Sequence, residues 1–418
     1  MSDSLFSTFL KLKGNTRACV YTEPLWGLSM NLCMPYLAKY MAELDISHSR
    51  IGFFVTVNIV SQIICSFLSG PITDKIGRRK ATAIFDFISW SIPCLFWWHA
   101  EGFWFFLIAA ILNGGNAITV NSWNCLLIED AEKKQITRIY SLVIAFGQLS
   151  AIFAPITAAL ISKLTIIPAI KILFINAFVL MTLKIIILYL TSKETSTGKM
   201  RLIEAKGKNI FQLAGGYKDI IKMIFKSRGM VFSIIIAALA MIVSIINITF
   251  WQIIATKKLF VPDDHLPYYL IFRSGLAIVF LFFVIPRLLK GNLRIPLLLA
   301  FASYFIGQFL LISIPVDGMF KYPLILVSLV FDGFGLAALN MACESLIAIY
   351  VNPNERAGIF ALRYMFIMIV AAPFGWIGGI LSEINKNLPF ILNMVILAAG
   401  TVLTLIHYRK KNDHSAEH

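Results

Sequence analysis

Long apolar segments separated by short polar stretches make up most of this chain. A run of about 20 mostly apolar residues can cross the hydrocarbon layer of a membrane as a helix. The sequence contains twelve such runs: 18–43, 49–70, 81–98, 103–128, 139–162, 166–191, 229–256, 266–285, 295–315, 322–350, 357–383 and 388–407. The pattern therefore predicts an all-α membrane protein with twelve transmembrane helices.

One long polar segment, residues 192–228, interrupts this pattern and separates six apolar runs from six. Its second part, 209–228, alternates apolar residues with lysines, which is typical of an amphipathic helix lying at the membrane surface. We expect an N-terminal bundle over 1–191, a basic cytoplasmic linker over 192–228 and a C-terminal bundle over 229–418.

Composition supports a membrane protein. The chain is 58% hydrophobic and 14% charged, which is too apolar for a soluble globular protein of 418 residues. The net charge of +15 could indicate nucleic-acid binding, but the cations lie in loops between apolar runs, so no nucleic-acid partner is expected. The polar N-terminus lacks a signal-peptide cleavage site, and the first apolar run is expected to stay in the mature protein.

The distribution of basic residues predicts the orientation. With the N-terminus in the cytoplasm, inward segments hold 26 of the 37 Lys and Arg residues, and outward loops hold 6. Basic residues are enriched in cytoplasmic loops. We therefore predict a multi-pass protein of the cell membrane with both termini in the cytoplasm.

The loop between the second and third runs reads Gly-Pro-Ile-Thr-Asp-Lys-Ile-Gly-Arg-Arg-Lys over residues 70–80, here named the signature loop. It resembles the conserved loop of the major facilitator superfamily of secondary transporters. The resemblance implies two pseudo-symmetric six-helix bundles that alternate between inward-open and outward-open states. It also implies a gating role for six residues: Gly70, Asp74, Gly77, Arg78, Arg79 and Lys80.

No enzymatic motif stands out. The sequence has no phosphate-binding loop of the form G-x-x-x-x-G-K-[ST] and no recognisable catalytic triad, so an ion or solute gradient is expected to supply the energy. The six cysteines lie in or beside apolar runs without metal-binding spacing. They are interpreted as small buried hydrophobic residues, and no metal or cofactor is expected.

Charged residues inside apolar runs need a partner or a function. Asp332 lies near the middle of the tenth run, and Glu344 lies at a depth similar to that of Arg363 in the eleventh. We predict that Asp332, Glu344 and Arg363 serve in proton coupling, although a Glu344–Arg363 pair could equally be structural. Asp86 is expected to pair with the nearby basic loop, and Lys184 to extend to a helix end.

Polar residues on the first, fourth, seventh and tenth runs are candidates for cargo binding, because these helices line the central cavity in the resembled family. The candidates are Glu23, Trp26, Asn113, Asn116, Asn124, Asn247, Trp251 and Asn340. Amides offer donors and acceptors, and an indole offers a flat apolar face, which suits a polar solute. Asn can instead link membrane helices by hydrogen bonds.

We therefore expect a transporter for a small polar solute, such as a sugar, glycoside or nucleoside, driven by protons. Efflux of amphipathic compounds or lipids is the alternative within transport. A membrane sensor or scaffold that binds but does not move its ligand is the alternative of another class. The expected partners are the solute, protons and the lipid bilayer, and the protein is expected to be a monomer.

Overall fold

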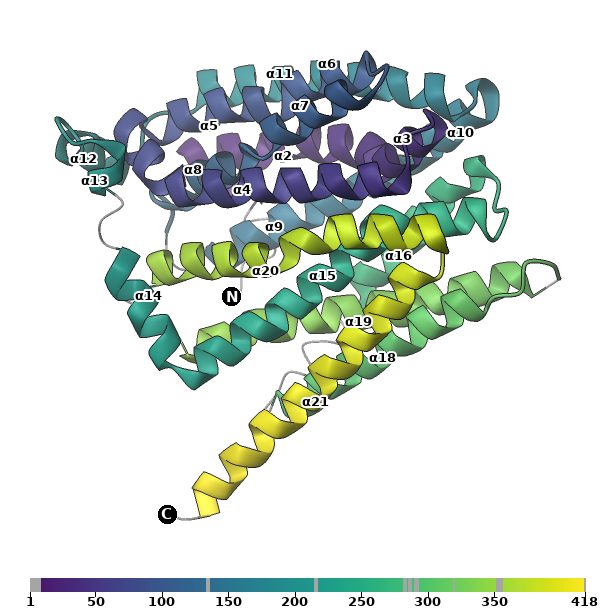
Figure 1. Ribbon diagram of the computed structural model, residues 1–418. Helices are drawn as coiled ribbons and strands as arrows, with labels where there is room; N and C mark the ends of the chain where they lie inside the picture. The colour runs from purple at the N-terminus through teal and green to yellow at the C-terminus, as the bar shows by residue number, and fades with distance from the viewer. Residues whose placement is uncertain are drawn as a thin grey trace. The chain divides into compact units, whose positions relative to one another are not determined.

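The computed structural model describes residues 9–132, 136–213, 217–280, 284, 288, 293–318, 320–350 and 356–416. Every regular element among these residues is a helix (Figure 1). Nine helical stretches in the described ranges are long and apolar enough to span a membrane. The all-α membrane fold is thus confirmed, whereas the count of twelve depends on three further segments.

Those three segments are not single uninterrupted helices within the described ranges. The first apolar run forms α2 (Gly14–Cys33), the 3₁₀ turn η1 (Met34–Tyr36) and α3 (Leu37–Glu43). The fifth run forms α9 (Ile136–Leu149), η3 (Ser150–Phe153) and α10 (Ala154–Leu164). The eighth forms α16 (Leu266–Val279), beyond which only isolated residues up to 292 are described. Pro35 lies in η1, and Pro155 follows η3. Proline interrupts an α-helix because it cannot donate the backbone hydrogen bond that continues the helix.

The chain divides into two compact units. Unit 1 comprises Met1–Leu44 and Val57–Lys218, and unit 2 comprises Asp45–Thr56 and Asp219–His418. The segment Asp45–Thr56 thus brings into unit 2 the residues just before α4 (His48–Ile76) and the first part of that helix.

The remaining spanning helices of unit 1 follow the predicted apolar runs. They are α4 (His48–Ile76, from Val57 onward), α5 (Arg78–Asp86), the π-helical turn η2 (Phe87–Ser91), α6 (Ile92–Trp98), α7 (Phe103–Asn113), α8 (Asn116–Ile128) and α11 (Ile166–Thr191). Helix α2 packs against α8, α9 and α11, and α5 packs against α8.

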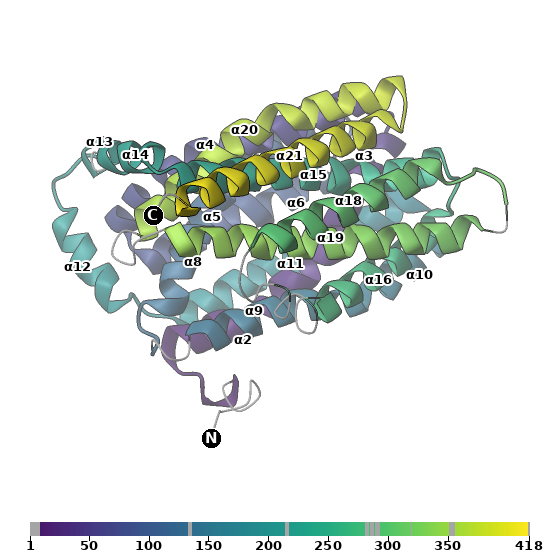
Figure 2. The ribbon, with the colours of Figure 1, turned by 90° about the horizontal axis from the view of Figure 1, so that it is seen from below.

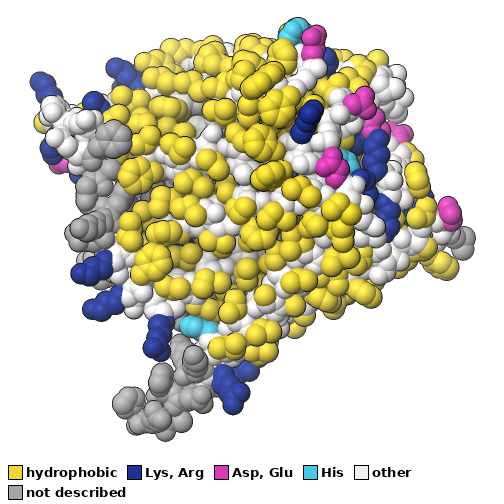
Figure 3. All heavy atoms as spheres, viewed as in Figure 1, with side chains coloured by type: hydrophobic (Ala, Val, Ile, Leu, Met, Phe, Trp, Pro, Cys, Tyr) yellow, Lys and Arg dark blue, Asp and Glu magenta, His cyan; other side chains and the backbone are white. Residues whose placement is uncertain are grey.

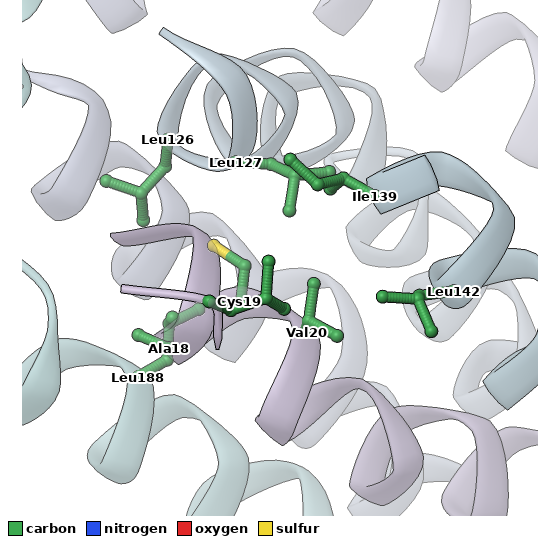
Figure 4. Packing of buried hydrophobic residues seen from close by; sticks show 9 residues of the cluster. Ala18, Cys19, Val20, Leu126, Leu127, Ile139, Leu142 and Leu188 are labelled. Carbon is green, nitrogen blue, oxygen red and sulfur yellow. The ribbon is translucent and has the colours of Figure 1, made fainter. Parts of the chain in front are cut away.

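Figure 4 shows the hydrophobic cluster at this packing point, where Cys19 and Val20 of α2 lie among Leu127, Ile139 and Leu142. Cys19 is fully buried and free, as are Cys33 and Cys94. The described residues contain no group of His, Cys, Asp and Glu side chains that could hold a metal ion.

The polar segment after unit 1's last span is helical in part. It forms α12 (Ser196–Glu204), α13 (Ile210–Leu213) and α14 (Tyr217–Lys226). The side chain of Thr195 caps α12 by accepting a hydrogen bond from the Gly198 amide at 2.9 Å. The amphipathic stretch predicted over 209–228 therefore contains two short helices.

Unit 2 consists mainly of long helices. In chain order its elements are α15 (Arg228–Lys257), the short 3₁₀ turn η4 (Asp263–His265), α16, α18 (Arg294–Ser313), α19 (Lys321–Tyr350), α20 (Arg356–Ile384) and α21 (Leu388–Ala416). Helix α18 runs beside both α19 and α21 (Figures 1 and 2). A Cβ on Gly335 of α19 would lie 2.7 Å from the backbone nitrogen of Tyr304, so this glycine permits the close approach of α18.

Hydrophobic side chains cover most of the face seen in Figure 3, and Lys and Arg side chains gather toward its two margins. An apolar surface of this extent would be unfavourable in water and is suited to lipid.

Candidate functional site

A buried carboxylate organises the polar interior of unit 2. Asp332 of α19 is only 4% exposed. Its Oδ1 and Oδ2 atoms accept hydrogen bonds from Nε2 of Gln308 at 2.8 and 2.9 Å, and Oδ2 also accepts one from Nδ2 of Asn247 at 3.1 Å. Asp332, predicted from sequence as a coupling residue, thus lies at the centre of an interhelical network.

The network extends through neutral groups on both sides. Nδ2 of Asn247 also donates to the Tyr304 hydroxyl at 3.1 Å, and Nδ2 of Asn393 donates to Oε1 of Gln308 at 3.1 Å. The five residues come from α15, α18, α19 and α21. Sequence reasoning missed Tyr304, Gln308 and Asn393, although a glutamine and an asparagine in the middle of apolar runs were a usable signal.

The Asp332 carboxylate has no direct ion pair among the described residues. Arg273 of α16 is half-buried and acts on Asp332 through its electrostatic field. A charged carboxylate in a membrane interior is costly when its contacts are neutral. Protonation of Asp332 removes that charge without removing the carbonyl oxygen that accepts hydrogen bonds.

Several buried polar atoms of α15 and α21 have no hydrogen-bond partner in the described part of the chain. They include Oδ1 of Asn247 and Nε1 of Trp251 on α15, and Oδ1 of Asn393 on α21. The Trp251 ring packs edge-on against Tyr269 at 5.7 Å. An acceptor and a donor left without partners on successive turns of α15 are suited to a polar ligand, because buried polar groups are normally paired.

In unit 1 two of the three predicted amides, Asn113 and Asn124, form hydrogen bonds with protein groups. Nδ2 of Asn113 donates to the Ser89 carbonyl at 2.7 Å, and its Oδ1 accepts from Nδ2 of Asn58 at 3.0 Å. These contacts link the α7 end to η2 and α4. Interhelical hydrogen bonding of this kind is the alternative to cargo binding that the sequence analysis gives for these asparagines.

Asn124 has a similar environment. Its Nδ2 donates to the Val120 carbonyl at 2.7 Å, and its Oδ1 accepts from the Tyr140 hydroxyl at 3.1 Å. Asn116 is half-buried and has no hydrogen-bond partner among the residues described. Asn116 is therefore the more available amide of the α8 helix.

The two remaining candidates differ in exposure. Trp26 is half-buried and its ring lies edge-on to that of Trp90 at 5.9 Å. Asn340 of α19 is exposed. Neither observation assigns a ligand to these residues, and their role in cargo binding stays a prediction.

The expectation that Asp86 pairs with the basic loop is wrong. Asp86 accepts a hydrogen bond from Nζ of Lys184 at 2.6 Å, and the two residues are 1% and 3% exposed. Lys184 was expected to extend to a helix end, but α11 places it against α5, so its ammonium is paired in the interior. Glu23 of α2 is also buried and interacts electrostatically with both residues.

The signature loop forms a tight turn between α4 and α5. Gly70 lies within α4, and Gly77 adopts a φ of 89°, a conformation that favours glycine. Nη1 of Arg78 binds Oδ1 of Asp74 at 2.8 Å, and Nε of Arg78 donates to both Glu129 carboxylate oxygens at 3.2 Å. Arg78 thus joins two acids, of which the sequence singled out only Asp74.

A third acid, Glu194, binds the start of α5. Its carboxylate accepts hydrogen bonds from the backbone amides of Arg78 at 2.9 Å and Arg79 at 3.2 Å. Nη2 of Arg79 donates to the Tyr189 carbonyl at 2.6 Å, while Lys80 is exposed. Carboxylates are stabilising at a helix N-terminus, so Glu194 attaches the beginning of the linker to the signature loop.

The pair predicted between Glu344 and Arg363 is only partly described. Arg363 of α20 is 8% exposed. The Glu344 side chain lies outside the described residues, although its backbone belongs to α19. The pairing and its role in coupling stay predictions.

Comparison with known structures identifies the same architecture in several transporters. The nucleoside transporter NupG matches with 16% identity and a TM-score of 0.69 over 94% of this chain and 98% of that one. A POT family transporter in complex with a thioalcohol-conjugated peptide matches with 14% identity and a TM-score of 0.69, over 95% and 96%. The human organic anion transporter MFSD10 matches with 12% identity and a TM-score of 0.64, over 93% and 98%. At these identities the likeness shows the fold alone.

Sequence comparison gives the family. No curated protein sequence matches the chain. The model of the Major Facilitator Superfamily matches residues 25–322, which is more than half of the protein. The signature loop, the helical membrane fold and this match agree, and the chain therefore belongs to the Major Facilitator Superfamily as a transporter and not an enzyme.

Proposed function

We propose that the protein moves a small polar solute, of the sugar, glycoside or nucleoside type, by alternating access and that protons drive the movement. The observation that carries the proposal is the buried Asp332 carboxylate, which is held by neutral donors at 2.8 to 3.1 Å. A carboxylate in this setting can gain and lose a proton without breaking an ion pair. Each protonation changes the charge of the interior of unit 2.

The polar groups available for cargo support a solute that is itself neutral and polar. Oδ1 of Asn247 and Nε1 of Trp251 are an acceptor and a donor without charge, and Asn116 adds an amide in unit 1. Flat aromatic faces at Trp251 and Trp26 suit a sugar or base ring. The structural similarity to NupG, a nucleoside transporter, supports the same class of solute.

The same proposal includes the arrangement in the membrane. The protein forms an N-terminal bundle, a basic linker and a C-terminal bundle, and it works as a monomer in the cell membrane. The excess of basic residues on one side, 26 against 6, supports a cytoplasmic location of both termini.

The experiment that tests this function has two steps. Purified protein is first screened by thermal unfolding against nucleosides, sugars and glycosides, because a ligand that binds the folded state raises its Tm. Each stabilising compound is then offered as a radiolabelled solute to proteoliposomes under an inward proton gradient. We expect accumulation of at least one neutral polar solute, abolished by a protonophore.

Two outcomes would contradict the proposal. Stabilisation and export of amphipathic compounds, with no effect of polar solutes, would indicate the efflux alternative. Tight binding without movement of the solute across the vesicle membrane would indicate a sensor. Solute accumulation that does not depend on the proton gradient would contradict proton coupling but not solute transport.

A further inference from the structure

A pocket lined by three lysines lies at one end of unit 2, apart from the Asp332 network. It has a volume of about 450 Å³ and is bounded by Lys257 and Lys258 at the end of α15 and by residues 384–387 at the turn from α20 to α21. Figure 3 shows Lys and Arg side chains in the region of this turn, with Asp and Glu side chains close by. We propose that this pocket binds a phosphate group, an assignment that goes beyond the proposed transport function.

The charge of the pocket is unusual for its place in the sequence. Outward loops hold only six Lys and Arg residues, and Lys257, Lys258 and Lys386 are three of these six. Basic residues are depleted on this predicted side of membrane proteins. Their convergence from two distant segments in one pocket therefore needs a local explanation.

Helix capping explains the position of two of the lysines. Nζ of Lys258 donates to the Ile312 carbonyl at 2.7 Å, and Nζ of Lys386 donates to the Ser382 carbonyl at 2.7 Å. These carbonyls lie near the ends of α18 and α20, where cations are stabilising. Nζ of Lys386 also lies 3.2 Å from Nδ1 of His48.

The helix caps hold the ammonium groups of Lys258 and Lys386 in place but do not use all of their hydrogen-bond donors. An ammonium group carries three donors, and Lys258 uses one of them in its hydrogen bond to the Ile312 carbonyl of α18. Burial lowers the pKa of Lys258, and burial with the nearby charge of Lys257 lowers the pKa of Lys386. The exposed Glu383 opposes this effect on Lys386, but the pKa of Lys386 is lowered overall.

The chemistry of the pocket selects an oxyanion with several acceptors. The three lysines that line the pocket supply cationic donors, which match the distributed charge of a phosphate group. Asn385 and Asn387 add amides to the lining, and Ile384, which is 72% exposed, adds an apolar edge. A lysine cluster next to an exposed aliphatic side chain is suited to a phospholipid head group with its acyl chain alongside, and free phosphate offers the same group.

The test measures binding to the purified full-length protein by isothermal titration calorimetry. The probes are inorganic phosphate, dihexanoyl-phosphatidylglycerol and, as the zwitterionic lipid, dihexanoyl-phosphatidylcholine, all at one ionic strength because screening weakens these contacts. The variant K257Q/K258Q/K386Q removes the pocket charge. The variant R50Q/K163Q/K321Q is its matched control, since it removes the same charge from the other three outward basic residues.

We expect the pocket variant to bind phosphate or phosphatidylglycerol at least about tenfold more weakly than the wild type, a loss of about 1.4 kcal/mol, with the control variant unchanged. Lys257→Gln alone, which leaves both helix caps in place, should show a smaller loss in the same direction. Glu383→Gln should strengthen binding. Binding of both anionic probes would indicate that the phosphate group itself is recognised, whereas binding of phosphatidylglycerol alone would assign the site to lipid.

Three results would overturn the proposal. The first is that neither anionic probe binds the wild type. The second is that phosphatidylcholine binds as well as phosphatidylglycerol and the lysine changes have no effect. The third is that the control variant loses as much affinity as the pocket variant, which would show a response to net charge alone. Solute transport does not enter these readouts, so the test stands whether or not the proposed function is correct.

Discussion

Lys184 and Asp86 form a buried ion pair inside unit 1, with Nζ and Oδ2 at 2.6 Å. The pair joins α11 to α5, and Glu23 of α2 adds a second acid to its electrostatic surroundings. A buried charge without its partner is strongly destabilising. This arrangement gives the pair a structural role.

Replacement of Lys184 by Met should lower the free energy of unfolding by about 3 to 5 kcal/mol, because it leaves the Asp86 carboxylate buried and uncompensated. Unfolding of the purified variant in detergent, followed by circular dichroism, measures the loss. Lys80→Met is the matched control, since Lys80 is exposed, and it should change stability little.

The double variant D86L/K184M separates charge from packing. It should regain much of the lost stability, since an apolar pair of similar volume can replace a buried ion pair. A double variant less stable than K184M alone would show that the two residues act through other contacts.

Asn113→Ala should lower stability by about 1 to 3 kcal/mol, because the change removes the donor to the Ser89 carbonyl and one of the two acceptors of the Asn58 amide. Asn116→Ala provides the comparison, since that amide has no partner in the described ranges. The two variants are measured for Tm and for cargo affinity. A loss of affinity at normal stability in N113A would restore Asn113 as a cargo-binding residue.

Asp74→Asn should slow transport while leaving expression and cargo affinity nearly unchanged. The change weakens one contact of Arg78, whose guanidinium keeps Glu129 as a second partner. Arg78→Gln, which removes both contacts, should have the larger effect. Turnover of reconstituted D74N equal to that of the wild type would exclude the Asp74 contact from the transport cycle.

Much of the fold could be predicted from sequence because the bilayer imposes one strong rule. Each spanning segment must be apolar and helical, so hydropathy located the spans, and the signature loop identified the family. The interruptions at Met34–Tyr36 and Ser150–Phe153 were not predicted, since a proline-associated turn within an apolar run leaves hydropathy unchanged.

The site was harder to predict because side-chain partners depend on helix rotation. Asp332 was identified because a charged side chain in an apolar run is energetically costly. Its hydrogen-bonded network with Gln308 and Asn393, which lie on other helices, could not be predicted from one sequence. Lys184 was assigned to a helix end by its depth alone. Its pairing with Asp86 depends on the packing of α11 against α5, which no local pattern encodes.

Phosphate binding at the lysine pocket should weaken as pH rises. A lysine is charged below its pKa and loses its charge as pH rises through that value. Because the pKa of Lys258 and of Lys386 is lowered by burial, this loss begins at a lower pH than for an exposed lysine, whose pKa is about 10.4. Titration calorimetry with phosphatidylglycerol, which keeps its charge over this range, measures the effect, and an affinity that rises with pH would contradict it.

The central claim is that the Asp332 carboxylate carries the proton that drives transport. Asp332→Asn keeps the size of the side chain and an oxygen that accepts from Gln308 and Asn247, but it cannot take up a proton. Asp264→Asn, in the short turn η4, is the matched control for loss of one carboxylate from unit 2. Both variants are reconstituted and tested with the cargo found in the thermal screen.

The decisive measurement is cargo accumulation in proteoliposomes under an imposed proton gradient, alongside exchange of cargo without any gradient. We expect D332N to exchange cargo at a rate close to that of the wild type but no longer to concentrate it, whereas D264N should do both. Accumulation by D332N to the wild-type level under the proton gradient alone would contradict the claim.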